Sequence, residues 1–133
     1  MKYLLSLIIV LCRCLPAYTQ DRVKYSQRDS IITTELLKSC MNECKAKDNS
    51  LMYFARKLKS IPYVARTLEG GERERLVVNL RQLDCTTYVE NVIALYLCIK
   101  NEKTTFRDFC NYLRNIRYEN GIVTYPTRLH YFS

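Results

Sequence analysis

The sequence contains a single histidine, His130, and no Cys-x-x-Cys pair among its 133 residues. Protein zinc sites are built from closely spaced cysteines and histidines, so we do not expect a zinc site here. No helix-turn-helix, zinc-finger or aromatic RNA-binding pattern is present, and the basic residues are scattered along the chain. Repeats and low-complexity tracts are also missing. These absences argue against a nucleic-acid partner, and the length suits one domain with one core.

No apolar run approaches the roughly 20 residues of a membrane-spanning helix, so we expect no stable membrane span. The first residues instead follow the layout of a cleavable secretory signal peptide. Lys2 supplies a positive start, Leu4 to Cys12 are apolar apart from one serine, and Ala17-Tyr18-Thr19 offers a small-residue cleavage site. We therefore expect residues 1–19 to be a signal peptide.

A lipoprotein signal is the weaker alternative for this segment. Cys12 and Cys14 follow bulky Leu11 and charged Arg13, where lipoprotein processing needs small residues. We expect an exported protein of the periplasm or cell envelope. Without residues 1–19 the chain keeps 19 basic and 13 acidic side chains, a net charge near +6. This excess favours anionic partners, and for an exported protein an anionic cell-wall polymer fits better than nucleic acid.

Five cysteines remain after the signal peptide, so a monomer keeps at least one unpaired thiol. Cys40 and Cys44 lie four apart in a helical pattern, which places their Cβ atoms about 5–6 Å apart. This exceeds the usual disulfide separation of roughly 4 Å. Cys98 and Cys110 occupy apolar helix positions and are expected to be small buried hydrophobic residues. The fifth cysteine, Cys85, lies at the start of a predicted helix, and its position therefore differs from those of the other four.

Apolar periodicity predicts a chain of helices with little sheet. The predicted elements are helices over residues 29–47, 51–59, 85–100 and 105–117, extended segments over 63–68 and 76–80, and a hairpin over 118–125. Asp84 is expected to cap the third helix, which is apolar nearly all round and should be buried on most sides. Thr105 and Asp108 are spaced as a capping box for the fourth. The predicted fold class is α+β, with most of the sheet missing from the chain.

Cys85 is predicted at the first turn of the most buried helix. Free N–H groups and the positive end of the helix dipole stabilise a thiolate there. The same N–H groups suit the oxyanion that forms when a thiolate attacks an amide carbonyl. The neighbouring Asp84 carboxylate opposes a second negative charge. From position alone, Cys85 is either a nucleophile or one more small core residue.

The stretch from Leu76 to Leu95, LVVNLRQLDCTTYVENVIAL, closely resembles the signature of the N-acetylmuramoyl-L-alanine amidase-like cysteine hydrolases, an NlpC-like, papain-related branch of bacterial cell-wall hydrolases. Flanking pieces match in the same order: Ile61-Pro62-Tyr63-Val64, Thr67-Leu68-Glu69, and Tyr125 with residues 127–132. The resemblance implies a papain-like α+β fold, Cys85 as nucleophile, and cleavage of the amide between the muramic acid lactyl group and L-alanine. It requires no metal or organic cofactor, and its partners are peptidoglycan fragments (muropeptides), bound by a monomer if the domain is complete.

The resemblance also suggests residues for the substrate cleft. The substrate-side candidates are Asp84, Thr86, Glu90, Arg128, His130 and Tyr131. Arg128 suits two-pronged binding of a peptide carboxylate, and a surface arginine is the simpler alternative. Glu90 reaches either a polar group of the cleft or a lysine on a solvated face. His130 is a cleft residue, an ordinary exposed residue or the general base.

In the family the general-base histidine lies further along, in a strand of the following sheet. We therefore expect residues 20–133 to be the N-terminal portion of a single, truncated amidase-like domain, and this chain alone to be inactive. The alternative to an amidase is an inactive family member that at most binds cell-wall fragments.

Overall fold

The structure is a computed structural model that describes residues 23–44 and 46–129. The predicted signal peptide, His130 and Tyr131 lie outside the described residues. The elements, in chain order, are β1 (Val23–Lys24), α2 (Gln27–Glu43), η1 (Lys47–Asn49), α3 (Ser50–Leu58), β2 (Leu76–Val77), α4 (Cys85–Lys100), α5 (Phe106–Arg117), η2 (Glu119–Gly121) and η3 (Tyr125–Thr127). None of the described helices is long and apolar enough to cross a membrane.

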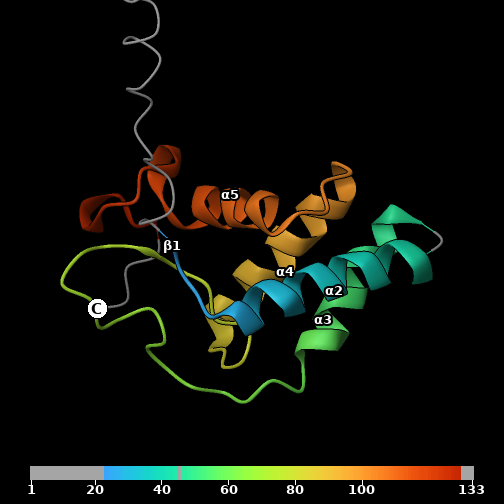
Figure 1. Ribbon diagram of the computed structural model, residues 1–133, viewed down its shortest axis with the longest axis horizontal. Coiled ribbons are helices and arrows are strands. Elements are labelled where there is room, and N and C mark those ends of the chain that lie inside the picture. Colours follow the sequence, from blue (N-terminus) through green and yellow to red (C-terminus); the bar gives the residue numbers. More distant parts are fainter. Residues whose placement is uncertain (1–22, 45, 130–133) are drawn as a thin grey trace, which may run out of the picture.

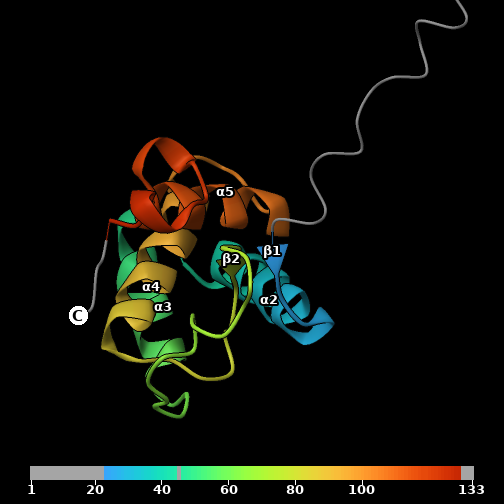
Figure 2. The same ribbon diagram turned by 90° about the vertical axis from the view of Figure 1, so that its left-hand side faces the viewer.

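Helix α4 is the centre of the fold, because α2, α3 and α5 all pack against it. Figures 1 and 2 show α5 lying across one side of α4 and the α2–α3 pair on another. The buried core includes Leu37 of α2, Phe54 of α3, Leu95 of α4 and Phe109 of α5, each fully buried. Strands β1 and β2 form a parallel two-stranded sheet. The fold is therefore mostly helical with a small sheet, as expected for an α+β chain.

The helix starts follow from short-range side-chain caps. At α4, the Asp84 carboxylate accepts from the Thr87 N–H at 2.8 Å, and the Thr87 hydroxyl accepts from the Asp84 N–H at 2.9 Å. At α5, Thr105 accepts from the Asp108 N–H at 3.1 Å. Such caps satisfy N–H groups that the first turn of a helix leaves without acceptors. Both predicted helix starts are confirmed.

Asp29, in the first turn of α2, ties this helix to the segment after β2. Its buried carboxylate accepts from the Ser26 N–H at 2.9 Å, from the Leu80 N–H at 3.0 Å and from Arg81 Nε at 3.2 Å. Burial raises the pKa of Asp29, but these hydrogen bonds outweigh burial and the net pKa is lowered. The contact fixes the segment that leads into α4.

Two sequence predictions differ from the structure. The hairpin predicted over 118–125 is wrong: the segment winds into η2 and η3, and an isolated antiparallel bridge joins Tyr118 to Arg128. The segment predicted as extended over 63–68 instead forms a turn over residues 65–68. The segment predicted over 76–80 pairs with β1 as a strand over Leu76–Val77, and α4 is buried on most sides with Val89 exposed.

Candidate active site at the start of helix α4

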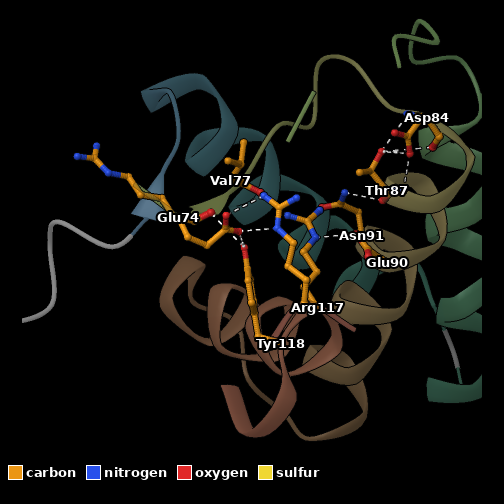
Figure 3. Close-up of polar contacts among 10 residues, drawn as sticks. Glu74, Val77, Asp84, Thr87, Glu90, Asn91, Arg117 and Tyr118 are labelled. Atoms are coloured by element: carbon orange, nitrogen blue, oxygen red, sulfur yellow. Dashed lines mark hydrogen bonds and ion pairs between the residues drawn. The ribbon is translucent and has the colours of Figure 1, made fainter. Parts of the chain in front are cut away.

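Cys85 is the first residue of α4 and is exposed to solvent. Its N–H and that of Thr86 lie in the first helical turn, where an α-helix supplies no carbonyl acceptor. The cap joins the Asp84 carboxylate to the Thr87 N–H (Figure 3), so it does not take up these first two N–H groups. A thiol in this position faces the positive end of the helix dipole together with two free donors. The arrangement suits thiolate attack on a carbonyl and stabilisation of the resulting oxyanion.

The other described cysteines are in different surroundings. Cys40, Cys98 and Cys110 are buried, and Cys44 is half-buried. Burial raises the pKa of Cys98 and of Cys110 to about 12. Their thiols are therefore protonated at neutral pH and poor nucleophiles, because the thiolate is the reactive form. Cys85 alone combines exposure with a helix N-terminus among the described cysteines.

A cavity of about 360 Å³ opens beside Cys85. Its walls come from the start of α4, the segment 63–69, the end of α5 and η3. The lining residues are Tyr63, Ala65, Arg66, Leu68, Glu69, Asp84, Cys85, Thr86, Thr87, Glu90, Arg117, Tyr118, Tyr125 and Arg128. Arg66 has a φ of 62°, in the left-handed region that a residue with a side chain rarely adopts. Such strained residues concentrate at functional sites, and here one forms part of the wall beside the thiol.

Glu90 and Arg117 form a buried ion pair in this wall. Arg117 Nε lies 2.6 Å from Glu90 Oε2, and the two side chains are only 5% and 4% exposed. Arg117 Nη1 also donates to the Val77 carbonyl of β2 (Figure 3). The pair therefore joins α4, α5 and β2 directly behind the cavity.

A second carboxylate–arginine contact lies where η3 meets the segment before β2. Glu74 holds Arg128 in a two-pronged geometry, with Nε and Nη2 at 2.7 and 2.9 Å from its two oxygens. The Tyr118 hydroxyl donates to the same carboxylate at 2.5 Å (Figure 3). Burial, with help from Glu74, raises the pKa of Tyr118. The hydrogen bond that Arg128 donates to Glu74 raises the pKa of Arg128, which therefore stays charged.

The structure brings four of the substrate-side candidates together around Cys85. Asp84, Thr86, Glu90 and Arg128 all line the cavity. Their contacts differ from those considered from sequence: Glu90 pairs with a buried arginine rather than an exposed lysine, and Arg128 grips a carboxylate of its own chain. The candidates His130 and Tyr131 lie outside the described residues.

Sequence reasoning missed Arg117, Glu74 and Tyr118. A signal for Arg117 exists in its position, because it lies four residues after buried Leu113 on the apolar stripe of α5. A charged residue at such a position must find a buried partner. Glu74, in an irregular loop, has no comparable signal.

No three histidine, cysteine, aspartate or glutamate side chains gather in a way that could hold a metal ion within residues 23–44 and 46–129.

Comparison with solved structures finds relatives of similar fold. A crystal structure named as an N-acetylmuramoyl-L-alanine amidase from Bacteroides uniformis matches with a TM-score of 0.58 at 38% identity, covering 64% of this chain and 36% of that one. A structure named as a putative xylanase from Bacteroides fragilis matches with a TM-score of 0.55 at 39% identity, covering 59% and 34%. The protein LPG0564 from Legionella pneumophila shares the fold, with a TM-score of 0.64 at 20% identity over 78% and 34%.

This chain thus spans about a third of the length of the solved structures that it matches. No curated protein sequence matches it at a significant level. A family model does match, over residues 53–133, and its description is AmiA-like, N-acetylmuramoyl-L-alanine amidase-like. The matched region contains Cys85, the cavity beside it and both carboxylate–arginine pairs. The chain therefore belongs to the N-acetylmuramoyl-L-alanine amidase-like family.

Proposed function

We propose that this chain carries the nucleophile-bearing part of a cysteine amidase that cleaves the amide between N-acetylmuramic acid and L-alanine in peptidoglycan. The observation that carries the proposal is an exposed thiol, Cys85, at the start of a capped helix and at the wall of a cavity. Membership of the amidase-like family supports this substrate class. The likeness to the Bacteroides uniformis amidase supports it too.

In the proposed reaction the Cys85 thiolate attacks the lactyl carbonyl and forms a tetrahedral oxyanion. The N–H groups of Cys85 and Thr86 stabilise that oxyanion. Its collapse breaks the C–N bond, the L-alanyl peptide leaves with a proton, and a thioester remains on Cys85. Water then hydrolyses the thioester and regenerates the thiol. In the mechanism that the family resemblance implies, a histidine takes the thiol proton, and we propose a base from outside the described residues.

The cavity residues have distinct proposed roles. Asp84 fixes the helix start through its cap on Thr87, so it positions the nucleophile. Glu90 holds Arg117 behind the cavity and shapes the wall against which the substrate lies. Thr86 and Arg128 are proposed to make polar contacts with the muropeptide, together with His130 and Tyr131.

The finer classification is part of the same proposal. We propose that the domain is of the NlpC-like, papain-related type, that residues 1–19 direct export, and that residues 20–133 belong to a single domain. The cavity wall also carries Arg66, whose guanidinium is of the kind that binds a peptide carboxylate.

The test is incubation of a complete domain that contains residues 20–133 and the general base with defined muropeptides, followed by mass spectrometry of the products. Release of a stem peptide with a free L-alanine amino group is expected, and Cys85→Ala should abolish it. Cys44→Ser is the matched control, because it removes a thiol that does not line the cavity, and it should keep full turnover.

Retained turnover in Cys85→Ala would remove Cys85 from the mechanism. Binding of muropeptides without cleavage, at equal affinity in both forms, would replace the amidase with a cell-wall-fragment binding module. Neither binding nor cleavage would overturn both candidates.

A further inference from the structure

Two sulfur atoms lie in contact where α2 ends. The Sγ atoms of Cys40 and Cys44 are 3.3 Å apart, and both residues are free thiols. Of the described cysteines, these two alone share a thiol hydrogen bond. We propose that Cys40 and Cys44 form an intramolecular disulfide site that closes on reaction with a disulfide-bearing oxidant. This inference is independent of the proposed amidase function, since neither residue lines the Cys85 cavity.

The end of the helix makes this contact possible. In a continuous α-helix, residues four apart hold their Cβ atoms about 5–6 Å apart, which is too far for a disulfide. Helix α2 ends at Glu43, and Cys44 has an extended backbone with φ −88° and ψ 111°. Its N–H still donates to the Cys40 carbonyl at 2.9 Å, so the two residues stay close. The expectation that this pair cannot be bridged assumed that the helix continued past Cys44, and that assumption is wrong.

The difference in burial between the two thiols determines which one reacts first with an oxidant. Cys40 is fully buried, whereas Cys44 is half-buried and within reach of solvent. Burial raises the pKa of Cys40 to about 12, and the hydrogen bond with Cys44 adds to the effect. Cys40 is therefore protonated and shielded, and Cys44 is the thiol that an oxidant meets first.

The chemistry balances with a disulfide oxidant as co-reactant. Cys44 loses its proton to solvent, and its thiolate attacks the oxidant, forming a mixed disulfide and releasing one oxidant thiolate. Cys40 then gives its proton to that thiolate and attacks the Cys44 sulfur, which releases the second oxidant thiolate. Two S–H bonds are lost, one S–S bond forms within the chain, and the oxidant disulfide becomes two thiols.

Closure would act on the fold through α2. This helix packs against α4 and α3, so the bond would fix the C-terminal end of a helix that supports the nucleophile helix. Cys85, which lines the cavity, would keep its thiol, because its partners there include no cysteine.

The test uses the whole purified chain, equilibrated with mixtures of oxidised and reduced glutathione, then denatured, alkylated and digested with trypsin. Cleavage after Lys38 and Lys45 places both cysteines in one peptide, residues 39–45. Under mixtures that leave Cys98 and Cys110 fully alkylated, we expect no peptide 39–45 that carries two alkyl groups. The peptide should instead carry none and be lighter than its reduced, unalkylated form by the mass of two hydrogen atoms.

Variants separate this outcome from others. Cys44→Ser should leave Cys40 reduced under every mixture, whereas Cys98→Ser and Cys85→Ser should leave the oxidation of peptide 39–45 unchanged. A peptide that stays doubly alkylated in the wild-type chain throughout, or that carries glutathione on Cys44 without closing, would overturn the proposal. Loss of alkylation that disappears in Cys85→Ser would overturn it too, because the bridge would then involve another thiol.

Discussion

Removing the Glu90 carboxylate should destabilise the fold strongly, because it leaves the Arg117 guanidinium buried without a counter-charge. The two side chains are 4% and 5% exposed and lie 2.6 Å apart. Breaking such a buried pair by removing one partner costs about 3–5 kcal/mol. Since a domain is stabilised by only about 5–15 kcal/mol in total, Glu90→Ala should remove a large part of the unfolding free energy.

A double-mutant cycle tests the physical reason for this loss. Glu90→Ala and Arg117→Ala each leave one buried charge without its partner, but the double variant leaves none. The double variant should therefore lose less stability than the two single losses added together, with a coupling of about 0.5–3 kcal/mol. Urea unfolding followed by the helical circular dichroism signal measures all four proteins.

An exposed ion pair provides the matched control. Lys47 and Glu102 also lie 2.6 Å apart, but their side chains are 53% and 76% exposed. Glu102→Ala should change the unfolding midpoint far less than Glu90→Ala, because solvent screens exposed charges. Two results would refute the assignment of a coupled buried pair. One is stability losses that simply add in the Glu90–Arg117 cycle, and the other is equal stability losses in Glu90→Ala and Glu102→Ala.

Three further predictions concern Asp29, the caps and the thiols. The folded-state pKa of Asp29 lies below its ordinary value of 3.8, so its stabilisation is complete above about pH 4 and is lost as the pH falls through the folded pKa. The stability difference between wild type and Asp29→Asn should therefore shrink on acidification, as measured by urea unfolding at several pH values. Thr105→Ala should cost about 0.5–2 kcal/mol in the same assay, since it removes the cap of α5. A thiol-specific electrophile should label Cys85 in the folded, reduced chain, and label Cys98 and Cys110 only after unfolding, as read by peptide mass spectrometry.

Each of these three predictions has an outcome that would contradict it. A constant gap between wild type and Asp29→Asn across the acid range would mean that the Asp29 charge is not what stabilises the contact. An unchanged midpoint in Thr105→Ala would show that tertiary packing alone fixes the start of α5. Labelling of Cys98 before Cys85 would contradict the burial pattern.

Local features of the fold were predictable from sequence. Asp84 and Thr105 are preferred N-cap residues next to strong apolar periodicity, and the start of each helix depends only on residues within one turn. The end of α2 was harder, because the residues after Cys44 carry no proline or glycine that would mark it.

The contacts that build the site depend on residues far apart in the chain. Glu90 meets Arg117, 27 positions away, and Glu74 meets Arg128, 54 positions away. No periodicity or propensity links such positions, since their meeting is decided by how α4, α5 and the loop before β2 pack. The family resemblance suggested Cys85 and Arg128 as site residues, but it did not suggest Glu74 as the partner of Arg128.

The loop that delivers Cys85 is anchored at both ends by hydrogen bonds that its backbone N–H groups donate. At one end the Leu80 N–H donates to Asp29, and further along the Leu83 N–H donates to the Pro62 carbonyl at 3.1 Å. Arg81 and Gln82 between them are exposed. Substitutions at Gln82 should thus be tolerated and leave the thiol in place, which makes it a suitable attachment point for a fluorescent reporter of ligand entry into the neighbouring cavity.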